Sequence, residues 1–160
     1  MKEEPLHIPS YLAGFIDGEG SIGLNKELDK RKGPRYFHYR PSLQIVNTHE
    51  GVMKFIHQQL GYGDYRHVGE NRRHHRGIYR VAVRNQGYLL ELLKCLLPYL
   101  IIKRRQAELL VEYIEQRQNA WAKGWHKPTT ARDHEIFKEL RILNLRGEAA
   151  KERDLIKEAI

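Results

Sequence analysis

The chain has little of what builds several common classes of protein. Cysteine occurs once in 160 residues, as Cys95 within an apolar run. That count excludes an intrachain disulfide framework and a zinc site made of several cysteines, and we expect an inert core thiol. Apolar runs are too short to span a membrane, and no signal-peptide pattern is visible. We therefore expect a soluble intracellular protein with no membrane partner, in the cytoplasm of a prokaryote or in an organelle.

Acidic residues are scarce relative to basic ones. There are 28 Lys and Arg against 20 Asp and Glu, giving a net charge of +8 with His neutral. Seven acidic and six basic residues lie between Asp133 and Ile160, so the positive excess precedes that segment. Basic domains bind polyanions because binding releases condensed counterions. Charge thus favours a nucleic-acid partner, although many basic proteins are charged only for solubility.

Hydrophobic periodicity predicts the order helix, hairpin, helix, hairpin, helix, followed by one or two amphipathic helices after Thr129. The expected helices are 10–17, 47–60, 85–97 and 104–119, and the expected strands are 21–27, 37–46, 64–68 and 78–84. Gly61 is the expected stop of the second helix, and Asn85 is the expected cap of the third. This αββαββα order predicts an α+β fold in which helices back a four-stranded antiparallel sheet. We expect a core of residues 1–120 and a helical extension of residues 121–160 that packs on it.

The first expected helix carries small residues at a spacing that favours close contact with another backbone. Ser10 is its expected N-cap. Gly14 and Gly18 are four residues apart, so they share one side of the helix. The glycines around Glu19 end the helix and place that carboxylate at the corner with a strand. The alternative is a purely structural role, in which this segment is a buried amphipathic helix and Glu19 is solvated.

Polar side chains that can recognise bases alternate with apolar ones along the expected strands. One sheet face is rich in Arg, Gln, Asn and Ser, and such a β-ribbon fits the major groove. Basic hairpin tips are suited to gripping phosphates at the edges. The alternative is an ordinary solvated sheet face. The residues predicted to bind DNA are Asn25, Arg40, Ser42, Gln44, Arg66, Arg72, Arg80 and Arg84.

Phosphodiester hydrolysis needs an activated water and neutralisation of the developing phosphate charge, which Mg²⁺ held by a carboxylate supplies. Each chain offers one obvious carboxylate for this, Glu19. Cutting two strands needs two such centres. One catalytic carboxylate per chain therefore predicts a symmetric homodimer, formed through the Gly14/Gly18 face.

Residues Leu12 to Gly20 closely resemble the signature of the LAGLIDADG homing endonucleases, and the similarity extends over roughly residues 8 to 118. The resemblance implies a curved DNA-binding sheet and residue roles. It assigns metal binding to Glu19 and the Gly18 carbonyl, ordering of the nucleophilic water to Asn47, and polarisation of that water to Lys103. The implied dimer interface is Leu12, Ala13, Gly14, Phe15, Asp17 and Gly18. Asn47 as a helix cap and Lys103 as a surface charge are the structural alternatives.

The function implied is a site-specific homing endonuclease that makes double-strand breaks in a long pseudo-palindromic DNA site as a homodimer, encoded within a mobile intron. Mg²⁺ is the expected cofactor, Mn²⁺ is expected to substitute, and Ca²⁺ is expected to support binding without cleavage. Two alternatives use the same scaffold: an RNA-splicing maturase with intron RNA as partner, and a non-cleaving DNA-binding regulator. A metal site built from histidines, such as His49 with His57 or His67 with His74 and His75, is a minor alternative.

Overall fold

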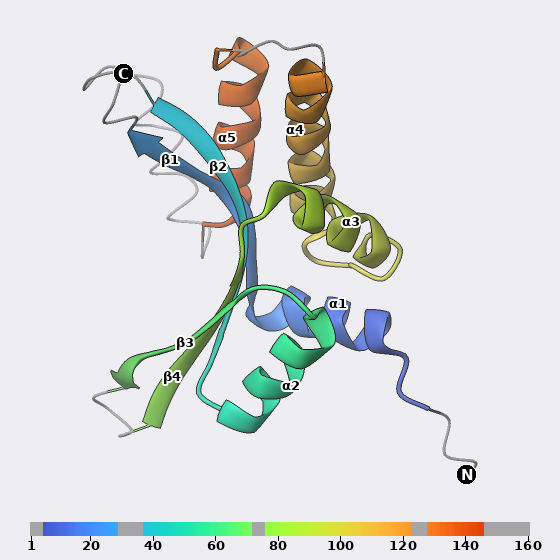
Figure 1. Cartoon of the computed structure of the whole chain (residues 1–160), viewed down its shortest axis with the longest axis vertical. Coiled ribbons are helices and arrows are strands. Elements are labelled where there is room, and N and C mark those ends of the chain that lie inside the picture. The colour runs from blue at the N-terminus through green and yellow to red at the C-terminus, as the bar shows by residue number, and fades with distance from the viewer. Residues whose placement is uncertain (1–4, 29–36, 72–75, 123–127, 146–160) are drawn as a thin grey trace.

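The computed structural model describes residues 5–28, 37–71, 76–122 and 128–145. Its elements follow the expected order, and the described residues after Thr129 form one helix, within the expected one or two. They are α1 (Ile8–Glu19), β1 (Gly20–Leu28), β2 (Phe37–Asn47), α2 (Glu50–Leu60), β3 (Asp64–Asn71), β4 (Arg76–Val83), α3 (Gln86–Leu96), α4 (Arg104–Ala122) and α5 (Ala131–Leu143). Figure 1 shows these helices to one side of a curved sheet, while no described helix covers its other side.

The sheet is antiparallel throughout, in the order β1-β2-β4-β3. Paired residues share a face, so the register separates the two faces cleanly. Ile22 lies opposite Leu43, and Ile45 lies opposite Val81, and all four are buried under the helices. The α+β fold class predicted from the sequence is confirmed.

Two helix starts differ from the sequence prediction. The N-cap of α1 is His7, whose Nδ1 accepts a hydrogen bond from the Ser10 backbone N–H at 3.4 Å, so Ser10 is not the cap. The N-cap of α2 is His49, whose Nδ1 accepts from the Val52 N–H at 3.1 Å. An imidazole nitrogen thus replaces the usual Ser, Thr, Asp or Asn oxygen at both starts. The expected stop at Gly61 is confirmed by its left-handed φ of 67°.

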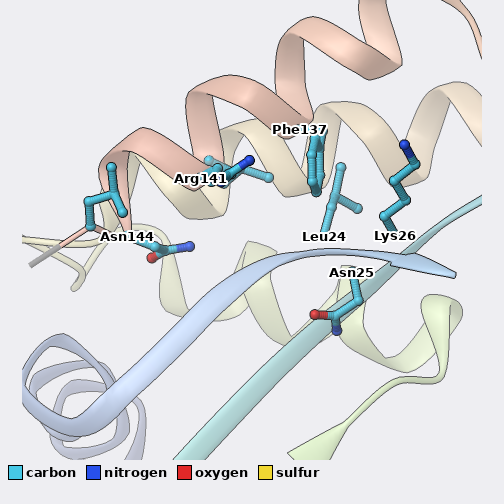
Figure 2. Close-up of a pocket in the computed structure, with 8 residues that line it drawn as sticks. Leu24, Asn25, Lys26, Phe137, Arg141 and Asn144 are labelled. Atoms are coloured by element: carbon cyan, nitrogen blue, oxygen red, sulfur yellow. The ribbon is translucent and has the colours of Figure 1, made fainter. Parts of the chain in front are cut away.

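α5 packs on α4 and on β1, the edge strand. In Figure 2, Leu24 and Lys26 point toward α5, whereas Asn25 points to the opposite side of the strand. Asn144 closes this contact by donating its side-chain N–H to the Ile22 carbonyl at 2.8 Å. At the other end of α5, Asp133 forms a capping box with its N-cap residue and is only 2 % exposed. The predicted boundary at residue 120 lies inside the continuous helix α4.

The hydrophobic core lies between the sheet and the helices, and α3 contributes Leu89, Leu93 and Leu96 to it. Cys95 is exposed on that helix, so the expectation of a core thiol is wrong. The reason is position: Leu93 and Leu96 occupy the inward face, and Cys95 falls outside that stripe. No helix among the described residues is long and apolar enough to cross a membrane.

Candidate active site and DNA interface

The end of α1 presents Glu19 to solvent at the junction with β1. Both Gly18 and Glu19 are exposed, and the strand begins at Gly20. A Cβ atom at Gly20 would lie 2.7 Å from the carbonyl oxygen of Ile16 and 2.9 Å from its Cγ2 atom. Because the φ of Gly20 is −84°, an ordinary extended value, glycine is needed there for space and not for handedness. The tight corner fixes where the Glu19 carboxylate emerges.

Asp17 connects this corner to the start of α4. Its carboxylate is buried and accepts three backbone hydrogen bonds, from the N–H groups of Ile101 at 2.8 Å, Ile102 at 3.1 Å and Lys103 at 2.9 Å. The Lys103 Nζ donates in return to the backbone carbonyl of Asp17. The positive end of α4 therefore receives a carboxylate from α1, and the negative end of α1 receives an ammonium from the residue before α4. We call this arrangement the reciprocal cap.

The reciprocal cap compensates an unfavourable local charge pattern. The first turn of α4 has no acidic residue, and it begins Arg104-Arg105 directly after Lys103. Three cations at the positive end of a helix dipole destabilise the helix unless an anion approaches. Glu108 pairs with both arginines, at 3.4 Å and 3.8 Å. Lys103 is held at the α1 end, beside the catalytic candidate, rather than standing as a surface charge.

Asn47 ends β2 at the same end of the sheet as Glu19. The first residue of β1, Gly20, pairs with Ile45, so Asn47 lies two residues further along β2, about 7 Å at the usual strand rise. Its Oδ1 accepts a hydrogen bond from the His49 N–H at 2.8 Å. Asn47 therefore orders the turn into α2, but His49 and not Asn47 caps that helix.

The end of α1 offers two oxygen atoms that could bind a metal ion. Among the described residues, no group of three His, Cys, Asp or Glu side chains could hold a metal ion. The exposed Glu19 carboxylate and the Gly18 carbonyl are oxygen donors, which suit Mg²⁺, and this ion commonly keeps several waters and phosphate oxygens as ligands. These two oxygen donors fit Mg²⁺.

The histidine alternative is not supported by the described geometry. His49 serves as the α2 cap, and the His57 Nε2 lies 3.1 Å from the Gly63 carbonyl oxygen. The ring of His67 contacts Tyr79, with centroids 5.1 Å apart. His74 and His75 lie outside the described residues.

The sheet face that carries no described helix holds the residues predicted to bind DNA. Asn25 and Arg40 are exposed and lie opposite each other, and Arg66 lies opposite Arg80. Gln44 is half-buried, as is Arg84, which follows β4. Arg72 lies outside the described residues.

Two of these side chains are less accessible than the alternation suggests. Ser42 is only 4 % exposed, and its Oγ accepts a hydrogen bond from the Asn25 amide at 3.0 Å. The Nε of Arg80 is buried and has no hydrogen-bond partner among the described residues. We therefore expect Ser42 to orient Asn25 rather than to contact a base.

Sequence reasoning missed two acidic residues on this face. Glu27 lies 3.3 Å from the Nε of Arg40, and Asp64 lies 2.8 Å from the Nε of Arg66. The period of two that placed Asn25 on this face places Glu27 there as well. Neither carboxylate was predicted because acidic side chains are not expected on a surface that binds a polyanion.

The predicted interface residues on α1 divide into two groups. Leu12 and Ala13 are buried in the chain's own core, and Asp17 is buried beside it. Gly14 and Gly18 are exposed, and no heavy atom lies within 4 Å of a Cβ built at either position. The surface that α1 offers to a second chain is therefore the glycine pair, with the half-buried Phe15 beside it.

The structure thus combines an open, curved antiparallel sheet, which carries Arg, Asn and Gln side chains on its free face, with an acidic helix end at its edge. A family model described as LAGLIDADG endonuclease matches residues 12–116. The chain belongs to the LAGLIDADG endonuclease family. No match was found among curated proteins.

Solved structures of homing endonucleases share the fold. I-CvuI, solved with the I-CreI target in the presence of Mg and with DNA not cleaved, is 23% identical, with a TM-score of 0.62 over 96% of this chain and 95% of that one. The archaeal intron-encoded I-Vdi141I, solved with DNA, is 22% identical, with a TM-score of 0.68 over 93% and 92%. I-AabMI, bound to uncleaved DNA, is 22% identical, with a TM-score of 0.60; the match covers 91% of this chain and 48% of that one.

Proposed function

We propose that this chain is a homing endonuclease that acts as a homodimer, depends on Mg²⁺ and cuts both strands of a long pseudo-palindromic DNA site. The observation that carries the proposal is the reciprocal cap, which holds Lys103 at the end of α1 where Glu19 is exposed. The intron-encoded neighbour I-Vdi141I supports a gene within a mobile intron.

The homodimer rests on the exposed surface beside α1. Ile101 is 85% exposed and Ile102 is 71% exposed, and Asp17 ties both to α1 through their backbone N–H groups. Large apolar side chains this exposed, next to two glycines with open space above them, favour burial by a partner. The match to I-AabMI covers about half of that longer chain, so two copies of this chain equal it in size.

The chemistry follows from what each residue offers. Bound Mg²⁺ supplies charge neutralisation and an acidified water. The Glu19 carboxylate and the Gly18 carbonyl would hold that ion. The Lys103 ammonium stabilises the negative charge that develops on the phosphate, and Asn47 orders the attacking water. A symmetric dimer presents two such sets, one for each strand.

The dimer also predicts the length of the site. Each chain covers about one helical turn, near 10 base pairs, so a full site spans about 20. A basic sheet face and an exposed Arg40 on each chain suit a duplex that runs along both sheets.

Glu19→Gln tests the catalytic assignment. We expect this variant to bind the selected DNA site in Ca²⁺ with unchanged affinity and to cut it at least about a hundredfold more slowly in Mg²⁺, because the neutral amide holds the ion poorly. Glu91→Gln, which removes an exposed carboxylate on α3, is the matched control and should cut normally. Retained Mg²⁺-dependent cleavage by Glu19→Gln would remove Glu19 from the mechanism. A wild-type chain that binds intron RNA and cuts no member of a random DNA library would support the maturase alternative.

A further inference from the structure

The open sheet face carries two carboxylates, each joined to an arginine on the same face. Asp64 on β3 lies 2.8 Å from the Nε of Arg66 and 3.7 Å from an Nη of Arg84. Glu27 on β1 lies 3.3 Å from the Nε of Arg40. In both pairs the short contact is made by the Nε of the arginine.

A carboxylate on a surface that meets a polyanion needs a physical explanation. It repels phosphates, so it is tolerated best over base edges and next to cations. The hydrogen bond from Arg66, together with the charges of Arg66, Arg84 and Arg80, holds the pKa of Asp64 below its usual range. Asp64 is therefore ionised at neutral pH and keeps its attraction for Arg66.

An arginine held by its Nε keeps its terminal nitrogens for another partner. Those two nitrogens match the O6 and N7 acceptors of guanine, the commonest specific contact in the major groove. Both arginines are also substantially exposed, with 48% of the Arg40 side chain and 62% of the Arg66 side chain open to solvent, so the outer edge of each guanidinium can reach another partner. Restraining the guanidinium before binding also reduces the side-chain entropy lost in the complex.

Building on the proposed function, we propose that Asp64 and Glu27 are positioning residues, which fix Arg66 and Arg40 so that each arginine recognises one guanine in every half-site. The two pairs lie on different hairpins of the sheet, β1–β2 and β3–β4 (Figure 1). They therefore read two separate base positions.

Selection from a random duplex library in Ca²⁺, with sequencing of the bound fraction, tests the β3 pair. The wild-type chain should prefer guanine at one position per half-site by about tenfold or more, as a bidentate contact gives. Arg66→Lys keeps the charge but loses the planar fork, so it should lose that preference and retain the other positions. Asp64→Asn should reduce the same preference by about threefold or more while raising affinity for unrelated DNA, because one negative charge is gone.

The control is Glu91→Gln, which makes the same charge change on α3 and should leave the preference at every position unchanged. Equal effects of Asp64→Asn at all positions would show that this carboxylate only adjusts net charge, and would overturn the proposal. An unchanged guanine preference in Arg66→Lys would overturn it as well. If the wild-type chain selects no sequence at all, the proposed function itself fails, which distinguishes the two outcomes. Glu27→Gln and Arg40→Lys repeat the test at the second position.

Discussion

Replacing Gly14 with alanine should change the folding of one chain and the pairing of two chains in opposite directions. Gly14 lies in the interior of α1, is exposed, and has no heavy atom within 4 Å of a built Cβ. Nothing in the single chain therefore requires glycine there. Glycine in a helix interior is less favourable than alanine by about 0.5–1 kcal/mol, so Gly14→Ala should stabilise the chain by that amount.

In the proposed dimer the same methyl group enters a contact between two backbones. Overfilling a packed contact costs about 1–3 kcal/mol, and twofold symmetry introduces the methyl twice, for about 2–6 kcal/mol. Since about 1.4 kcal/mol corresponds to a tenfold change, the dimer dissociation constant should rise by about 30-fold or more.

Two measurements separate these effects. Sedimentation equilibrium over a concentration series gives the dimer dissociation constant, and urea unfolding below that concentration gives the stability of the single chain. Gly87→Ala is the matched control, because Gly87 is an exposed helical glycine on α3 whose built Cβ meets only the Asn85 Oδ1, at 3.5 Å. A Gly14→Ala chain that pairs with wild-type affinity and still cuts both strands would refute the close contact along α1. A lower free energy of unfolding for the single Gly14→Ala chain would contradict the open space that the structure shows around Gly14.

Three further outcomes follow from the contacts described above. Asp17→Ala leaves three backbone N–H groups without their acceptor, so the free energy of unfolding should fall by about 3 kcal/mol or more in a urea titration, with Asp17→Asn intermediate. Ile102→Asp should leave the fold intact, because the side chain is 71% exposed, but should yield monomers by light scattering; a dimer would place Ile102 outside the interface. The pKa of Glu112 is lowered from 4.5 by Arg132, so this pair stabilises the fold fully above pH 4.5 and loses its effect as the pH falls further. The pair is partly exposed and contributes less than about 1 kcal/mol. Glu112→Gln should therefore reduce only slightly the decrease in the free energy of unfolding that is measured below pH 4.5.

The sequence predicts the element order and the sheet faces because both follow from local periodicity. Asn85 as the cap of α3 and Gly61 as the stop of α2 are confirmed for the same reason, since each acts on its own helix. The two histidine caps could not be predicted in this way, because histidine is not among the preferred N-cap residues. The Nδ1 atoms of His7 and His49 nevertheless accept hydrogen bonds from backbone N–H groups in the first turns of their helices.

The rest of the site depends on contacts between distant parts of the chain. The Asp17 carboxylate accepts hydrogen bonds from N–H groups 84 to 86 residues away in the sequence, and no local pattern predicts that pairing. The ion pair of Glu27 with Arg40 depends on the register between β1 and β2, which the sequence determines only once the sheet has formed, whereas Asp64 and Arg66 are two residues apart on β3. The roles of Glu19, Asn47 and Lys103 remain predictions, and Glu19→Gln tests the first of them.

The glycines of α1 and the chemistry at its end are linked by helix geometry. Packed helices with ordinary side chains keep their axes about 8–10 Å apart, and glycine allows a closer approach. Glu19 follows Gly18 directly, so the distance between the two Glu19 carboxylates in the proposed dimer is set by how closely the glycine faces approach. The family resemblance implies cutting across the minor groove, which is about 6 Å wide, so a close approach is what brings two centres to neighbouring backbones of one duplex. On this argument Gly14 and Gly18 act as spacers for the reaction, and larger residues there should misplace the cuts even where a dimer survives.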